Sequence, residues 1–197
     1  MASMALNYGI AEMKATGMLL LRRMMNTLAR KGDFDPAIFI VLSRDEMIDV
    51  QFDYDCMNSE AKKEVLFAKV REEARRQNAK AVIVVCDAWT IYYTEEEKTR
   101  IREDLKYQQR YEQIALRAGS CAEIEAAGFG RKVECISITV QSPTDVVLIQ
   151  QIYERAGAEK RSILFTHRVV EDSGQERLWY ATGRMAVWNT PGENRCS

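Results

Sequence analysis

Three side chains that can act as general acids or bases lie in strand-like runs of this sequence: Asp87, Glu134 and His167, the single histidine. A general acid or base needs its reacting partner within hydrogen-bond reach. Asp87 directly follows residues 81–86, a continuous apolar run that is typical of a strand buried on both faces. We therefore expect Asp87 and Trp89 at the rim of a sheet, where ligand crevices form in α/β proteins.

These residues also have purely structural interpretations. An aspartate that ends a strand commonly hydrogen-bonds local backbone, and a tryptophan beside it packs on a helix. His167 shares a strand face with Ile163, Phe165 and Val169. A histidine on an apolar face is usually hydrogen-bonded and neutral, so we expect His167 to be buried. Its conceivable catalytic partners are Asp87, Glu134 and Cys135.

A second group of candidates would bind a ligand rather than react with it. Residues 178–188 read as a strand in which Tyr180, Arg184 and Trp188 share one face. If that face of the sheet is uncovered, these side chains and Trp89 form a candidate binding surface. If a helix covers it, they belong to the core. Both interpretations stay open.

Recognised catalytic and cofactor motifs are absent from the sequence. It contains no G-x-x-x-x-G-K-[ST] phosphate loop and no G-x-S-x-G elbow, and its G-F-G at 128–130 lacks the third glycine of a dinucleotide fingerprint. The five cysteines form no C-x-x-C pair, and one histidine is too few for an H-E-x-x-H zinc site. We expect no metal and no cofactor, with an all-carboxylate Mg²⁺ site as the remaining formal alternative.

The composition describes an ordinary globular chain. It has 197 residues, of which 47% are hydrophobic and 29% charged, and a formal net charge of −1. This balance removes any global attraction to nucleic acid or an anionic membrane. A basic face on the predicted helix 60–78 would permit phosphate contact, although a solvated face is the commoner meaning. The run 17–21 is too short to span a bilayer, and the scattered cysteines fit a reducing cytoplasm.

The periodicity of apolar residues predicts an α+β fold. The order is α-β-β-α-β-α-β-β-β-β, with helices packed on a single, mostly antiparallel sheet of about seven strands. The predicted helices are 10–28, 60–78 and 94–117, and a further short helical piece is 120–127. The predicted strands are 37–42, 47–52, 81–89, 133–141, 146–155, 162–170 and 178–188. We divide the chain into an N-terminal helix (1–32), one domain (33–190) and a frayed tail (191–197).

The helix 94–117 is expected to begin with a capping box at Thr94 and Glu97. Its apolar side chains fall within about half of the circumference, so this half should face the protein. They are Ile101, Leu105, Tyr107, Tyr111, Ile114 and Ala115.

Two segments resemble a family of small uncharacterised bacterial and phage-associated proteins. Ala79 to Trp89 is similar to that family's A-x-A-V-x-x-V-S-E-A-W strand, and Arg131 to Val140 to its R-x-E-V-x-x-V strand. Here Asp87 stands where the family usually has Glu, and a long helix replaces a short polar loop. The resemblance implies an α+β fold and carries no function.

The first helix directs the functional hypothesis. Its apolar residues are Met13, Leu20, Leu21, Met24, Met25 and Leu28, which form a wider arc than one narrow stripe needs. Part of this arc should contact a second copy or another protein. We therefore expect a non-catalytic, cytoplasmic protein that acts through protein–protein contact or self-association. The alternative is an enzyme of unknown reaction with a carboxylate-based site near Asp87.

Overall fold

The structure, a computed structural model, describes residues 8–57, 59–118, 120–157 and 162–174. Within them the fold is α+β, with one antiparallel sheet in the order β2-β1-β3-β4-β5-β6. The strands are β1 (Ala37–Val41), β2 (Met47–Asp49), β3 (Ala81–Tyr92), β4 (Arg131–Gln141), β5 (Asp145–Ala156) and β6 (Ser162–Gly174). The helices are α1 (Ile10–Lys31), α2 (Glu60–Arg76), α3 (Glu95–Glu103), α4 (Leu105–Arg117) and α5 (Cys121–Ala126), with a 3₁₀ turn at Tyr54–Met57.

The predicted α+β class and antiparallel sheet are confirmed, and the number and order of elements need correction. The described residues form six strands rather than about seven. The expected strand 178–188 and the tail 191–197 lie outside the described residues. No described helix is long and apolar enough to cross a bilayer.

The prediction of one continuous helix over 94–117 is wrong. The helix ends at Glu103, and α4 begins at Leu105. Asp104 separates the two because its side chain accepts hydrogen bonds from the backbone N–H groups of Lys106 and Tyr107, both at 3.1 Å. An aspartate in this N-cap position satisfies donors that the first turn leaves open, so it starts a new helix.

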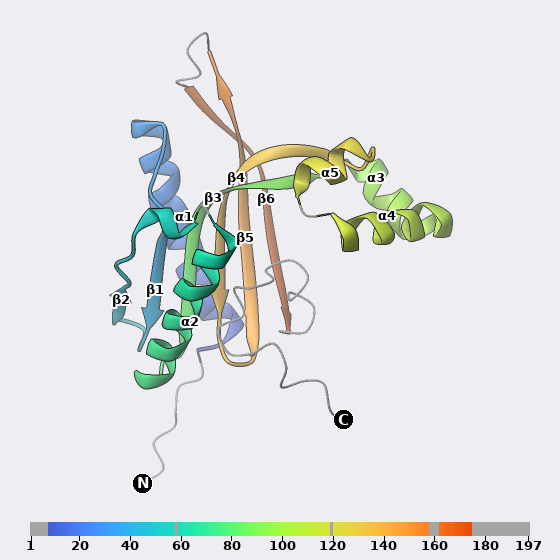
Figure 1. The fold of residues 1–197 in the computed structure, drawn as a ribbon. Coiled ribbons are helices and arrows are strands. Elements are labelled where there is room, and N and C mark those ends of the chain that lie inside the picture. The colour runs from blue at the N-terminus through green and yellow to red at the C-terminus, as the bar shows by residue number, and fades with distance from the viewer. Residues whose placement is uncertain (1–7, 58, 119, 158–161, 175–197) are drawn as a thin grey trace, which may run out of the picture. The chain divides into compact units, whose positions relative to one another are not determined.

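The described residues form two compact units, and the first contains residues 8–57, 59–87, 136–151 and 167–174. Helix α2 packs on one face of β1 and β3 (Figure 1). The pairing of Phe39 with Ile83 sets the register of these strands. The resulting core consists of alternate strand residues and one side of the helix: Ile38, Ile40, Leu66, Phe67, Val70, Ala74, Ala79, Val82 and Val84.

Helix α1 lies against β4 and β5 in the same unit and ends, as expected, at Gly32, whose φ is +84°. A Cβ on Gly17 would lie 2.6 Å from Ile149 Cδ1 and 3.4 Å from Val140 Cγ2, so glycine permits the close approach of helix and sheet. Of the six apolar residues that suggested an uncovered arc, four are buried in the chain's own core and only Met24 and Met25 are half-buried.

The second compact unit contains residues 88–135 and 152–166. We call its segment 93–130, which joins β3 to β4 and carries α3, α4 and α5, the helical connector. The connector packs through aromatic rings. Tyr111 lies edge-on to Tyr93 with ring centroids 5.8 Å apart. The ring centroid of Phe129 lies 4.9 Å from that of Tyr107 and 5.6 Å from that of Tyr111. A small apolar cluster of Val133, Cys135 and Ile152, with Ala88 and Tyr92 against it, supports the unit's strands.

Candidate functional site

Asp87 does not mark the end of a strand. β3 continues through it to Tyr92, and Asp87 is an exposed residue in the interior of the strand. The pairing of β3 with β1 ends near Val85, opposite Ala37, and β4 is the neighbour on the other side. Residues of β3 are buried on both faces up to Val85, and beyond it exposed and half-buried residues alternate. The apolar run therefore ends where burial on both faces ends, although the strand continues.

The prediction that His167 is buried is wrong. Its side chain is exposed, and the residues that share its face, Ile163, Phe165 and Val169, are only half-buried. β6 is the last strand in the described order of the sheet, and a face that is only partly covered does not force an imidazole out of water. His167 is also remote from Asp87: three strand spacings separate β6 from β3, which amounts to about 14 Å.

Glu134 is held in a structural ion pair. Its carboxylate lies 3.2 Å from Nε of Arg155, and both side chains are about a quarter exposed, at 24% and 25%. The Arg155 guanidinium also donates to the Tyr153 hydroxyl at 3.3 Å and lies over the Tyr153 ring. This network commits Glu134 to stabilising the second unit. The position of His167 on β6 keeps it away from Asp87 on β3.

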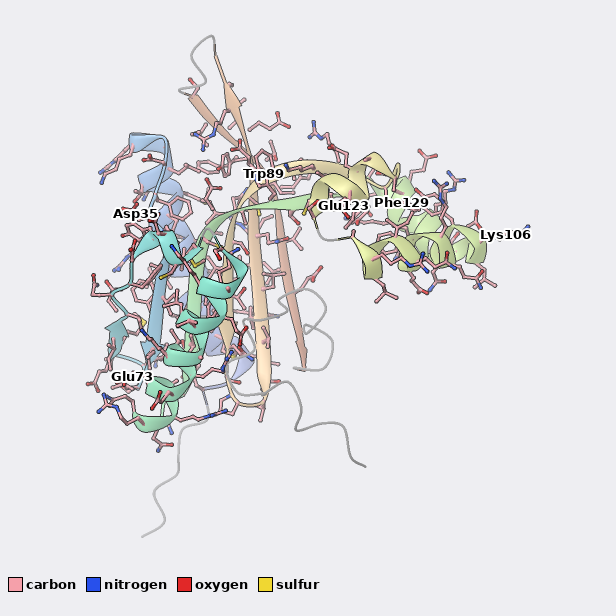
Figure 2. All side chains as sticks on the ribbon, viewed as in Figure 1. Asp35, Glu73, Trp89, Lys106, Glu123 and Phe129 are labelled. Atoms are coloured by element: carbon pink, nitrogen blue, oxygen red, sulfur yellow. The ribbon has the colours of Figure 1, made fainter. Side chains whose placement is uncertain are left out.

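Of the four residues proposed to bind a ligand, only Trp89 lies within the described residues. Tyr180, Arg184 and Trp188 lie outside the described residues. Trp89, labelled in Figure 2, is 54% exposed. Nζ of Lys132 lies 4.1 Å from the centre of its ring in a cation–π contact. Its carbonyl oxygen accepts a hydrogen bond from Sγ of Cys121 at 3.4 Å. Trp89 is therefore anchored at the surface of the second unit, with one ring face taken by a lysine.

Metal chemistry finds no support in the part of the chain that the structure describes, where no three His, Cys, Asp or Glu residues form a group able to hold an ion. Among the described residues, one shallow hollow of about 340 Å³ lies beside α2, and another of about 200 Å³ lies between α4 and α5. The second is lined by Gln113, Ile114, Arg117, Ala118 and Glu123.

The basic face of α2 is the one local argument for phosphate contact, and two of its arginines pair with acids of the same helix. Arg71 is buried and pairs with Glu64 at 2.9 Å, and Arg76 pairs with Glu73 at 2.6 Å. Arginines held in ion pairs are less available to a phosphate, whereas Lys62, Lys69 and Arg75 are exposed on the helix.

Hydrogen bonds fix both ends of the helical connector. Thr94 and Glu97 form the predicted capping box, and Glu97 also accepts a hydrogen bond from the backbone N–H of Gly130 at 3.1 Å. Hydrogen bonds from the Thr94 N–H, from the Thr94 hydroxyl and from Gly130 lower the pKa of the Glu97 carboxyl. At the same end, burial and the hydrogen bond with Tyr111 raise the pKa of Tyr93. One carboxylate therefore ties the entry of the connector to its exit.

The outer side of α4 carries the surface feature that sequence reasoning missed. Leu105 and Leu116 are 66% and 71% exposed, the two highest values among the exposed large apolar residues of the described chain. Gln109 and Glu112, also exposed, lie between them. Successive residues of a helix turn by 100°, so these four side chains fall within an arc of about 60°. We call this row the α4 stripe; Lys106, labelled in Figure 2, marks the first turn of the helix.

The expectation that Leu105 faces the protein is wrong because the helix breaks. As the first residue of α4, Leu105 follows the Asp104 cap and no longer continues the apolar side of α3. Tyr107, Tyr111 and Ile114 do face inward, as predicted, and are half-buried. Leu116 was the available signal, since it lies outside the apolar half of the helix and its exposure needs an explanation.

Comparisons of the chain with protein-family models, with curated proteins and with solved structures found no match. The resemblance of segments 79–89 and 131–140 to a phage-associated family therefore stays a prediction.

Proposed function

We propose that the chain is a non-catalytic binding protein that acts through protein–protein contact, with the α4 stripe as its contact surface. One observation carries the proposal: the two most exposed large apolar side chains of the described residues lie on the same side of one helix, about three turns apart. Single exposed leucines are common on protein surfaces. We infer a contact surface here because both leucines lie on one arc of the same helix.

The energetics of the stripe favour an apolar partner. Burying a leucine side chain that is otherwise in water contributes roughly 1.5–3 kcal/mol. Leu105 and Leu116 retain most of that contribution for a partner, because about two thirds of each is exposed. The stripe contains Gln109 and Glu112 and no lysine or arginine, which argues against a phosphate backbone or an anionic membrane.

The arrangement of the helical connector supports the same function. β3 and β4 are neighbours in an antiparallel sheet, and a turn of a few residues suffices to join such strands. The chain instead uses segment 93–130, whose three helices have no fully buried residue. A surface-exposed insertion of this kind costs conformational entropy and adds little core, so a role in recognition explains it best.

The first helix is a weaker candidate for the contact surface than the sequence suggested. The first helix buries four of the six apolar side chains of the expected arc in the core. Its remaining large apolar side chains are exposed or half-buried: Ile10, Met18, Leu19, Met24 and Met25. The enzyme with a carboxylate-based site near Asp87 stays the alternative proposal. A cytoplasmic location stays our proposal, in keeping with the free thiols of Cys56, Cys86 and Cys121.

A photo-crosslinking amino acid at position 116 tests the proposal inside the cell that makes the protein. We expect crosslinks to protein at positions 116 and 105. The matched control is position 65 on α2, where Val65 is 58% exposed and lies on a helix of the other unit. Crosslinking at 116 and 105 no stronger than at 65 would refute the α4 stripe as a contact surface.

A further inference from the structure

The α4 stripe reads the same way in both directions. From one end to the other it presents Leu105, Gln109, Glu112 and Leu116, that is, apolar, polar, polar, apolar. Its midpoint falls between Gln109 and Glu112. A two-fold axis placed there would bring each leucine of one helix opposite the other leucine of a second, antiparallel helix.

We propose that the partner of the α4 stripe is a second copy of this chain, seated antiparallel on α4 about such a two-fold axis. This inference rests on the proposed function above. In an interface of this symmetry the same patch serves both subunits, and every contact occurs twice. Leu105 of each copy packs on Leu116 of the other, so that four leucines leave water together.

The two polar residues in the middle are complementary in the same geometry. The Gln109 amide is a hydrogen-bond donor, and the Glu112 carboxylate is an acceptor. The antiparallel arrangement places each Gln109 opposite the Glu112 of the other copy. The carboxylate of Glu112 already accepts one hydrogen bond, from Gln108 of its own helix at 3.0 Å, and has lone pairs for another.

Other arrangements leave this pattern unmatched. A parallel pairing would set Glu112 against Glu112, and like charges in contact are unfavourable. A different protein would have to reproduce the leucine spacing and the donor opposite Glu112, whereas a second copy supplies both without further requirements. The patch is small for a specific interface, so we expect weak and reversible dimerisation.

Sedimentation equilibrium of the purified full-length chain, from roughly 5 to 500 µM, covers the affinity of a small interface. We expect a monomer–dimer equilibrium that Leu116→Glu abolishes and Val65→Glu leaves unchanged. A chain that stays monomeric over this range overturns the inference. So does an association that Leu116→Glu does not weaken while its circular dichroism shows an intact fold.

Two substitutions at Gln109 test the register without touching a leucine. Gln109→Lys places a cation opposite Glu112 of the second copy and should tighten dimerisation by about two- to ten-fold, whereas Gln109→Glu should weaken it by a similar factor. Equal effects of the two substitutions contradict the antiparallel contact. The position is exposed in the monomer, so both variants should fold.

A photo-crosslinker at position 116 of the purified chain, mapped by mass spectrometry, gives the orientation. Residues 105 and 116 lie about 16 Å apart along the helix axis. An adduct at or next to Leu105 of the second copy supports the inference, and an adduct near position 116 of the second copy overturns it. If the purified chain is monomeric while position 116 still crosslinks a different protein in the cell, the second copy is wrong and the proposed function survives. If neither crosslink forms, both fail.

Discussion

Gly130 is the position where one added methyl group should do most damage to the unit that carries the α4 stripe. Its φ is +63°, and a Cβ there would meet Ile91 Cγ2, the backbone carbonyl oxygen of Tyr92 at 2.8 Å and the Tyr93 ring at 3.0 Å. The carbonyl belongs to β3 and cannot swing away like the end of a side chain. Gly130→Ala must therefore shift the backbone where the connector rejoins the sheet.

Gly128 is a matched control two residues earlier. Its φ is +87°, and a Cβ would find nothing within 4 Å. Gly128→Ala therefore costs only the left-handed backbone conformation, about 1–2 kcal/mol. Gly130→Ala adds an overpacking cost of roughly 1–3 kcal/mol. Any shift of its N–H also weakens the hydrogen bond to Glu97, worth about 1.5–3 kcal/mol for a charged acceptor.

The assay should resolve the two units. Hydrogen exchange followed by mass spectrometry, read over residues 88–135, reports the local unfolding free energy of the second unit. We expect Gly130→Ala to lower it by at least about 2 kcal/mol more than Gly128→Ala. Equal effects of the two substitutions would refute the claim that close packing at Gly130 fixes the connector.

Three further predictions follow from the hydrogen bonds and burial described above. The hydrogen bond from the Thr94 N–H is the largest cause that lowers the pKa of Glu97. The ionised carboxylate therefore stabilises the fold above the unfolded pKa of about 4.3, and this contribution is lost as the pH falls through the folded pKa. Glu97→Gln should reduce the loss of thermal stability that an acid titration of the native protein shows. Burial, and next the nearby charge of Asp87, raise the pKa of Cys86 to about 11, so this thiol should resist alkylation at about pH 8 until urea unfolds the chain; rapid native labelling would contradict its burial. Glu134→Gln should lower the unfolding free energy by about 1 kcal/mol, and a double-mutant cycle with Arg155→Met that shows no coupling would rule out the ion pair as a stabilising contact.

Most strands of the sheet could be predicted from the sequence because each follows a local run of apolar or alternating residues. The run 81–86 forms the buried part of β3, and the runs starting at 133, 146 and 162 match β4, β5 and β6 to within two residues at their starts. The end of β3 was missed because it depends on pairing with a neighbouring strand. Apolar character stops where two-sided burial stops, while the backbone ladder continues.

The exposure of the candidate site residues could not be predicted from the periodicity of apolar residues. A period of two assigns His167 to a face, but only the partners of that face decide whether it is covered. The break at Asp104 was present in the sequence as an N-cap residue, and the continuing apolar period concealed it. The exposure of Leu105 and Leu116 follows from that break and from the way in which α4 packs through Tyr107 and Tyr111, which is tertiary information.

Hydroxyl-radical footprinting inside the cell measures whether the α4 stripe is covered where the protein works. We expect Leu105 and Leu116 to be oxidised several-fold less in the cell than in the dilute purified chain, while Val65, which is also exposed, reacts to the same extent in both. Equal oxidation of Leu116 in the two samples would contradict it.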